Sequence, residues 1–526
     1  MSQSPIVQSD VYETLAESLL MATPDAAKAI TEFEDPQYIL EEVVESTERG
    51  SSVGIEDVNA IIKTFAEEQS QARKETAAQQ TTTKDTKDSK SGQEVNSHNE
   101  PIGETVAERW PVVYEKLFGH DLSPVSPRGD PKYRSVEISG DITGKSTCTG
   151  TYAEFNSLFT SRYEKLERIL RKQLSPIDIS ALRYRHGMEV SVIGMVRRVW
   201  TTQKQNRLVE IESPEGVIRT VFTDEEEKEK TERVLTDEVV GIEGTLSDDG
   251  GIIFGETLTF PDVPYSHSIN RAERSVKAAF ISDVHLGADT FAYDKWNSFI
   301  EWINTEPEIE YLLIGGDLVE GIGVYPNQEE ELDVVDITDQ YRFCAQSLSQ
   351  LPEDLEIISI VGNHDTGTRL AEPQPAVESR FTELFPDNVT IVGNPATVTL
   401  EGVNILMYHG MSIHPLAEGI PGMTQDTPTD VMKLMLEKRH LAPMYGQNVR
   451  LAPEPEDHLV IEDVPDVLHC GHVHKFGVDE YRGVKLFNTS CWQYQTDFQK
   501  SKDISPDVGY VTVMDLLTHE CEYISF

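Results

Sequence analysis

Residues 278–285 read Ala-Ala-Phe-Ile-Ser-Asp-Val-His, an apolar run typical of a buried strand that leads directly into polar residues. Helical stretches separate this run from four further apolar runs with polar ends, at 311–317, 357–365, 405–410 and 467–474. Polar residues at the carboxyl ends of buried strands lie at one edge of an α/β sheet, where such folds present their ligands. The pattern therefore predicts an α/β domain over residues 275–526, with a candidate site at that edge.

The polar residues after these runs are of the types that bind divalent cations. Oxygen and imidazole ligands suit Mn²⁺, Fe or Zn²⁺. In the pairs Asp283-x-His285 and His472-x-His474, the alternation of a strand would turn both side chains toward the same ion. An aspartate can bridge two cations, and two neighbouring cations lower the pKa of a shared water. The sequence therefore predicts a two-metal site that hydrolyses phosphate esters.

Five short motifs at these positions resemble the motif set of the calcineurin-like metallophosphoesterases. They are Asp283-x-His285, Gly316-Asp317, Gly362-Asn363-His364-Asp365, His409-Gly410 and Gly471-His472-x-His474. Longer runs are similar to the small subunits of archaeal D-family DNA polymerases, at 316–328, 371–376, 439–446 and 492–496. The resemblance covers about residues 150–500 and implies a four-layer αββα metallophosphoesterase fold.

The resemblance also implies a role for each candidate residue. Asp317 would bridge two divalent ions, for which we expect Mn²⁺, with Fe, Zn²⁺ or Mg²⁺ as alternatives. His364 would be the general acid that protonates the leaving 3′ oxygen, steered by Asp365. The other ligands would be Asp283, His285 and His474 for one ion, and Asn363, His409 and His472 for the other. The implied reaction is metal-dependent 3′→5′ exonucleolytic cleavage of single-stranded DNA, which serves proofreading.

The same resemblance implies partners. DNA synthesis would take place in a separate large catalytic subunit, which docks on this chain, and single-stranded and primer–template DNA would be the substrates. The sliding clamp is a further partner that such an assembly allows. For Arg439 we expect a contact with DNA phosphates. At His414 the family pattern has an aspartate, so the role of that position is open.

Two other functions fit the same residues. The chain could be a non-catalytic structural subunit, or a stand-alone metal-dependent phosphodiesterase that acts on RNA or small nucleotides. The linker and barrel that precede the α/β domain favour a subunit over a lone hydrolase. The presence of the complete set of ligands favours a working nuclease, because the related eukaryotic proteins have lost them.

The first half of the chain divides into three parts. Apolar residues at helical spacing predict a small helical domain over residues 1–65. Residues 66–105 are nearly devoid of large apolar side chains, which predicts a disordered linker. Over residues 150–265 we expect an amphipathic helix, at 152–174, followed by an OB-type β-barrel of five short strands. Such a barrel fits a structural or docking role as well as it fits single-strand binding.

The net charge of −46 excludes a nucleic-acid binder that uses its whole surface, because phosphates are met by Lys and Arg. The acidic residues are spread along the chain, which indicates a protein of a high-salt cytoplasm, where salt screens the repulsion. The resemblance to a polymerase subunit implies that it is nucleoid-associated there. The five cysteines form no Cys-x-x-Cys pair, so we expect no disulfide framework. No apolar run is long enough to cross a bilayer, so we expect no membrane partner.

Overall fold

The computed structural model forms two units, Met1–Pro101 and Ile102–Phe526. In the first unit it describes only the strands β1 (Met21–Ala22) and β2 (Ser52–Val53), which pair in parallel. The helical domain predicted at 1–65 and the linker predicted at 66–105 lie otherwise outside the described residues, apart from Thr105. The second unit is described over 105–120, at 122, 125 and 128, and over 134–526 without 326, 327, 366, 447 and 448.

The first sheet of the α/β part has six strands in the order β12-β11-β10-β9-β18-β19. Its strands are β9 (Lys277–Ile281), β10 (Ile309–Ile314), β11 (Glu356–Ser359), β12 (Val389–Ile391), β18 (Tyr510–Asp515) and β19 (Cys521–Ser525). β9 to β12 are parallel, and β18 is antiparallel to both β9 and β19. Every residue of β10 is buried, as expected of a parallel strand that is covered on both faces.

The second sheet has six strands in the order β16-β17-β15-β14-β13-β3. Its strands are β3 (Val136–Ser139), β13 (Ala396–Leu400), β14 (Val403–Met407), β15 (Val467–Cys470), β16 (Phe476–Tyr481) and β17 (Val484–Thr489). β14, β15 and β17 are parallel. Each sheet therefore has a group of parallel strands whose carboxyl ends lie at the same edge and continue into loops. β3 pairs with β13 although it precedes residue 275, so the α/β part takes in a strand from outside the predicted range.

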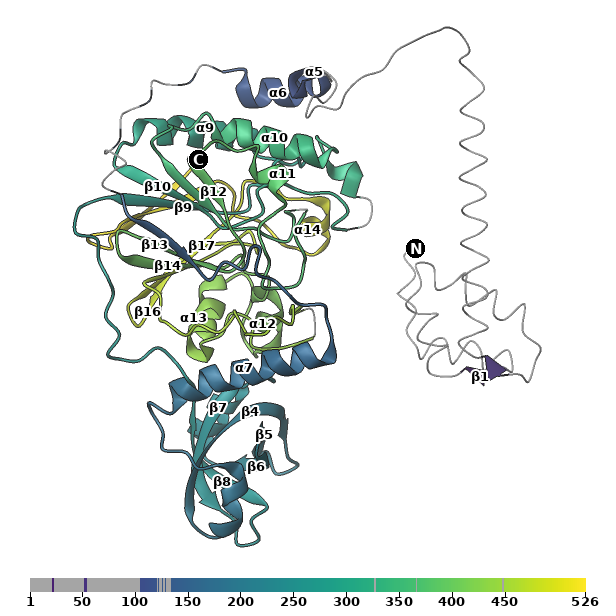
Figure 1. The fold of residues 1–526 in the computed structure, drawn as a ribbon, viewed down its shortest axis with the longest axis vertical. Helices are drawn as coiled ribbons and strands as arrows, with labels where there is room; N and C mark the ends of the chain where they lie inside the picture. Colours follow the sequence, from purple (N-terminus) through teal and green to yellow (C-terminus); the bar gives the residue numbers. More distant parts are fainter. Residues whose placement is uncertain are drawn as a thin grey trace, which may run out of the picture. The chain divides into compact units, whose positions relative to one another are not determined.

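The two sheets share a core that includes Phe280 and Tyr311 of the first sheet and Val398 and Phe487 of the second. Helices lie over the outer face of each sheet (Figure 1). Over the first sheet these are α9 (Tyr293–Thr305) and α10 (Ile337–Leu348), and over the second α12 (Ile413–Gly419) and α13 (Pro428–Lys438). Alternate residues of the central strands therefore face a sheet on one side and helices on the other.

Short helices complete the α/β part. They are α5 (Val106–Arg109), α6 (Pro111–Phe118), α11 (Ser379–Thr382), α14 (Asp497–Ser501) and the 3₁₀ helix η3 (Gln328–Glu331). Val106, Val113 and Leu117 pack into the same core as residues of α9 and α10. The segment 105–120 thus also belongs to the α/β part, which the sequence pattern did not predict.

The barrel is closed by five strands in the order β4-β5-β6-β8-β7. Its elements are η2 (Ile179–Tyr184), β4 (Glu189–Thr201), β5 (Arg207–Ser213), β6 (Gly216–Phe222), α8 (Glu225–Glu232), β7 (Val239–Leu246) and β8 (Ile252–Thr259). The five predicted strands are therefore confirmed, and α8 supplies the long connection before the fourth. The assignment to the OB type stays a prediction.

Helix α7 (Tyr152–Leu170) lies between the barrel and the α/β part (Figure 1). Thr151 and Glu154 form a capping box at its N-terminus, which explains where the helix begins. It ends four residues before the predicted position 174. Its apolar residues Leu158, Leu166 and Leu170 are buried, and Arg162 is fully buried as well.

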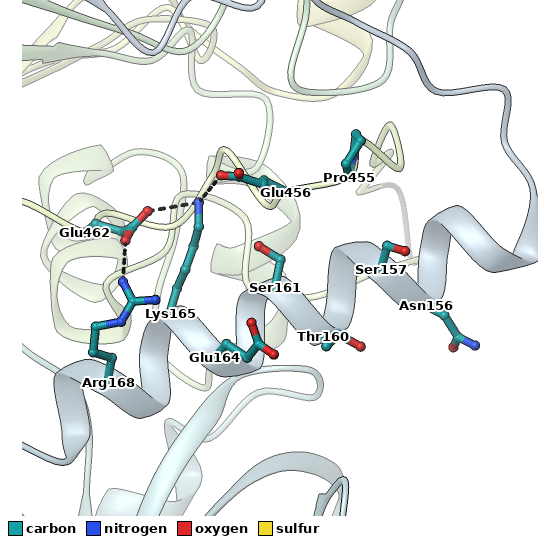
Figure 2. Close-up of a pocket in the computed structure, with 10 residues that line it drawn as sticks. All are labelled: Asn156, Ser157, Thr160, Ser161, Glu164, Lys165, Arg168, Pro455, Glu456 and Glu462. Carbon is teal, nitrogen blue, oxygen red and sulfur yellow. Dashed lines mark hydrogen bonds and ion pairs between the residues drawn. The ribbon is translucent and has the colours of Figure 1, made fainter.

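The opposite face of α7 lines an open cavity of about 550 Å³ (Figure 2). Lys165 Nζ lies 2.9 Å from Glu462 Oε1 and 3.4 Å from Glu456 Oε2. Arg168 Nη1 lies 3.2 Å from Glu462 Oε2. Lys165 and Arg168 thus form ion pairs with carboxylates of the same chain, as expected of a solvated helix face. Within the described part of the chain, no helix is both long and apolar enough to span a bilayer.

Candidate metal centre

The loops after five strands bring all seven predicted ligands together. From the first sheet, Asp283 and His285 follow β9, Asp317 follows β10 and Asn363 follows β11. From the second sheet, His409 follows β14, and His472 and His474 follow β15. The candidate centre therefore lies where the carboxyl ends of both sheets meet, as the sequence predicted.

The backbone conformation explains why paired ligands converge, and it differs from the prediction. β9 ends at Ile281 and β15 ends at Cys470, so neither pair lies within a strand. Asp283, His285, Asp317, His472 and His474 instead adopt left-handed conformations, with φ between 52° and 69°. This region is rare for residues other than glycine, and such strain is concentrated at functional sites. Left-handed loops, not strand alternation, direct these side chains to one place.

One group of ligand atoms consists of Asp283, His285 and His474. His285 Nε2 lies 3.0 Å from His474 Nε2 and 3.7 Å from Asp283 Oδ1. His474 Nε2 lies 3.5 Å from the same oxygen. All three residues are buried. Two imidazole nitrogens and a carboxylate oxygen that point at one another in this way form a donor set for a divalent cation.

A second group consists of Asp317, His409 and His472. His409 Nε2 lies 3.2 Å from Asp317 Oδ2 and 3.0 Å from Asn363 Oδ1. The rings of His409 and His472 are 5.1 Å apart between centroids. The nitrogen and oxygen donors of this group again suit a divalent cation.

Asp317 connects the two groups. Its Oδ2 lies 3.2 Å from His409 Nε2 in one group and 3.7 Å from His285 Nε2 in the other. Its Oδ1 accepts a hydrogen bond of 2.7 Å from the backbone N–H of His364. This carboxylate is therefore placed where it could contribute to both donor sets.

Hydrogen bonds on the far side of two rings fix how they present their nitrogens. His285 Nδ1 lies 2.8 Å from Glu320 Oε2, and His409 Nδ1 lies 2.8 Å from the carbonyl oxygen of Gly315. When Nδ1 donates to such an acceptor, Nε2 is left to bind a cation. Supporting contacts of this kind are typical of metal-binding histidines.

Burial and mutual attraction shift the pKa values of this centre. Burial lowers the pKa of His409, but the Asp317 carboxylate outweighs it and raises the pKa to about 10. Burial raises the pKa of Asp317, but His409 and His364 outweigh it and hold the pKa well below its usual value. Burial and the neighbouring His409 lower the pKa of His472 to about 3. The Asp317 carboxylate is therefore ionised and attracts positive charge, and divalent cations would displace the protons.

Comparison with known proteins places the chain in a family. The small subunit of DNA polymerase II from Halobacterium salinarum is 47% identical over 392 residues, which cover 73% of this chain and 77% of that protein. The protein of the same name from Archaeoglobus fulgidus is 41% identical over 413 residues, which cover 75% of this chain and 83% of that protein. The chain belongs to the family of archaeal DNA polymerase II small subunits.

Two further similarities are weaker. The model of a family described as the B subunit of DNA polymerase alpha/epsilon matches residues 278–478. The solved structure of an archaeal phosphodiesterase is 17% identical and covers 48% of this chain and all of its own, with a TM-score of 0.26. A structural likeness this slight does not establish a shared fold. Membership of the polymerase small-subunit family rests on the two archaeal relatives.

In this family member, Glu320 and not Asp365 contacts the His364 ring. His364 Nδ1 lies 2.8 Å from the carbonyl oxygen of Glu320 and 3.4 Å from its Oε1. Asp365 instead accepts hydrogen bonds from the backbone N–H groups of Gly362 and Leu318, at 2.8 and 3.0 Å. The predicted steering of His364 by Asp365 is therefore wrong, and Asp365 joins the loops after β10 and β11.

Arg439 is also placed differently from the prediction. It is 4% exposed, and its guanidinium donates to the carbonyl oxygens of Ile461 and Glu462, at 2.7 and 2.5 Å. A side chain that is buried and occupied by carbonyls in this way is not available for a DNA phosphate. The predicted contact of Arg439 is therefore corrected to a structural role at the end of α13.

Glu320 belongs to the candidate centre, but the sequence interpretation did not include it. Its carboxylate lies between His285 and His364, and Gln493 Nε2 donates to its Oε2 at 3.0 Å. The residue lies inside the 316–328 run, three positions after Asp317. The resemblance of this run to the polymerase small subunits could have pointed to Glu320, the carboxylate nearest to Asp317 within it.

Proposed function

We propose that this chain is the 3′→5′ exonuclease subunit of a heteromeric archaeal DNA polymerase. In this proposal the α/β part is a metallophosphoesterase of the four-layer αββα type and the barrel is an OB fold. The observation that carries the proposal is the pair of donor groups on either side of Asp317, with His364 directly beside them. A site used only for docking needs no such convergence of buried ligands.

We propose that these residues hold two divalent cations. Asp283, His285 and His474 would hold one, Asn363, His409 and His472 the other, and Asp317 both. Mn²⁺ is the ion we propose, because the mixed oxygen and imidazole set suits it. When bound, such cations activate water and neutralise the charge of a phosphodiester.

His364 has the properties of a proton donor. Burial lowers its pKa, but the Glu320 and Asp317 carboxylates outweigh it and raise the pKa above its usual value. The ring is held by the contact of Nδ1 with the Glu320 carbonyl oxygen at 2.8 Å. A protonated, oriented imidazole can donate to the leaving 3′ oxygen.

The proposed partners follow from the family. A large subunit would carry out synthesis and dock on this chain, and the single-stranded 3′ end of primer–template DNA would enter the centre. The sliding clamp would be reached through that complex. We propose a high-salt cytoplasm as the location, which fits the net charge of −46.

The test is nuclease activity of the complex with its large subunit, in high salt with Mn²⁺ and without deoxynucleotides. We expect the wild type to release mononucleotides from 3′ ends and His364→Ala to lose about 10²–10⁴-fold in rate. His186→Ala, at an exposed histidine of the barrel, is the matched control and should keep full activity. Equal activity of wild type and His364→Ala would indicate a contaminating nuclease, and no activity in either would favour a structural subunit.

A further inference from the structure

A cavity of about 320 Å³ opens beside the second donor group. Asn363 and His472, both proposed ligands, belong to its lining. Arg450 and His414 belong to the same lining, and neither is assigned a role by the mechanism above. The cavity therefore links the candidate centre to a region of the chain that the proposed chemistry does not use.

The walls of this cavity include several apolar side chains. They are those of Val324, Leu370, Met411 and Val449. Leu370 is 38% exposed, so it offers an uncovered apolar surface to whatever enters. Cavities of a few hundred Å³ with apolar walls and a few polar groups are typical of sites for small organic groups such as a nucleoside.

Arg450 is the arginine in the lining of this cavity. It is exposed, and its side chain forms no hydrogen bond or ion pair with any residue in the described ranges. Arg369, by contrast, lies 2.7 Å from Glu454 Oε1, and Arg162 lies 2.7 Å from Asp457 Oδ2. A guanidinium without a carboxylate partner, in a protein with 91 acidic residues, is suited to an anion from outside.

The other charged residues of the lining do not compete for Arg450. Glu372 is buried, and its carboxylate accepts hydrogen bonds from Tyr408 Oη at 2.9 Å and Asn394 Nδ2 at 3.0 Å. His414 Nε2 lies 3.4 Å from Glu418 Oε1. Arg450 therefore remains the group in this cavity that can bind a phosphate.

We propose that this cavity holds the penultimate nucleotide of the DNA strand and that Arg450 binds the phosphate on its 5′ side. The inference rests on the proposed function, because it takes the scissile phosphate to lie at the donor groups. When the last phosphodiester linkage of a strand lies at the donor groups, the rest of the strand extends from them in the 5′ direction. The next nucleoside must therefore leave the centre along an adjoining surface, and its next phosphate needs a cation.

The test removes either the Arg450 guanidinium or the charge of the phosphate that it is proposed to bind. One substrate is a single-stranded oligonucleotide, and the other is the same oligonucleotide with an uncharged methylphosphonate at the second linkage from the 3′ end. We expect Arg450→Ala to lower kcat/KM on the first substrate about 10-fold or more, as the loss of a charged hydrogen bond does. The methylphosphonate should lower the wild-type value by a similar factor, and the two changes together should lower it no further.

A third substrate separates this inference from the proposed function. The p-nitrophenyl ester of thymidine 5′-monophosphate has a phosphodiester but no second phosphate, so Arg450→Ala should hydrolyse it at the wild-type rate. Mn²⁺ binding measured by calorimetry should also be unchanged. Arg271→Ala is the matched control, because Arg271 precedes β9 and its Nη1 donates to the Leu517 carbonyl at 2.8 Å, at the opposite end of the strands.

Additive losses from Arg450→Ala and the methylphosphonate would overturn the inference, because they would show that the two groups do not meet. An equal loss on the p-nitrophenyl ester would also overturn it, since Arg450 would then act at the centre itself. A wild type that cleaves none of the substrates would instead overturn the proposed function, and the inference with it.

Discussion

Two buried clusters of histidine and carboxylate side chains differ in their source of positive charge. Asp457 lies 2.7 Å from Arg162 Nε and 3.0 Å from His440 Nε2. Asp317 has imidazoles and a backbone N–H around it, and no lysine or arginine pairs with it among the described residues. The first cluster contains a permanent cation, whereas the second has only groups that can lose their charge. The difference is the one expected between a structural network and a centre that binds cations from outside, as proposed above.

The effect on the histidines supports this distinction. Burial and the nearby Arg162 lower the pKa of His440 to about 4, so this ring is neutral beside Asp457. The pKa of His409 beside Asp317 is raised to about 10, because that carboxylate outweighs burial. A carboxylate that already has a guanidinium needs no protonated histidine. A carboxylate without a guanidinium favours a protonated histidine beside it, or a metal ion in place of that proton.

The largest effect is expected for Asp317→Asn. Loss of the shared carboxylate should weaken Mn²⁺ binding by more than the roughly 100-fold that removal of a supporting residue costs. Nuclease activity should fall by at least about 10⁴-fold, as it does when a group on which a whole site depends is removed. Calorimetry with Mn²⁺ and the mononucleotide release assay measure the two effects. Unchanged metal binding would remove the proposed distinction between the clusters.

The next largest effect is expected for Arg162→Met, and it should concern stability. Removing the guanidinium leaves Asp457 buried without its cation, which costs about 3–5 kcal/mol. Chemical denaturation at constant high salt measures this loss. Mn²⁺ binding should stay unchanged in the remaining folded protein, and a loss of metal binding together with stability would show that the two clusters are not independent.

The sequence interpretation succeeded where the signal was local. Each apolar run and the polar residue after it lie within a few positions, so the strands, and the place of Asp283 and Asp317 at their carboxyl ends, could be read directly. The role of Arg162 could not, because its partner Asp457 is 295 residues away. The helical pattern shows that Arg162 lies off the apolar stripe, but not that a carboxylate from a distant loop lies beside it.

The same limit applies to the loops of the candidate centre. Whether Asp365 or Glu320 reaches His364 depends on the φ angles of two loops, and local patterns do not determine left-handed conformations outside glycine. β3 was missed for a related reason, since its four residues become a strand only by pairing with β13, far along the chain. Tertiary contacts, and not local propensity, determine both the loop conformations around His364 and the formation of β3.

A smaller effect is expected for Glu320→Gln. The amide keeps the size of the side chain but removes the charge that holds His285 and His364, so Mn²⁺ affinity should fall about 10–100-fold. The free energy of unfolding should change far less than in Arg162→Met. Glu331→Gln is the matched control, because Glu331 accepts from Tyr325 Oη at 3.0 Å and does not contact a proposed ligand. Equal metal affinities of the two variants would contradict the supporting role of Glu320.

The smallest effect is expected on the outer face of α7, where Lys165 and Arg168 pair with Glu462 (Figure 2). Arg168 is 66% exposed and Glu462 40% exposed, so water and salt screen their attraction. Arg168→Ala should therefore change the free energy of unfolding by less than about 1 kcal/mol. Affinity for single-stranded DNA should also be unchanged, because the charge is already met within the chain. A clear loss of DNA affinity, absent in the control Arg171→Ala, would show that this face contacts nucleic acid despite its internal ion pairs.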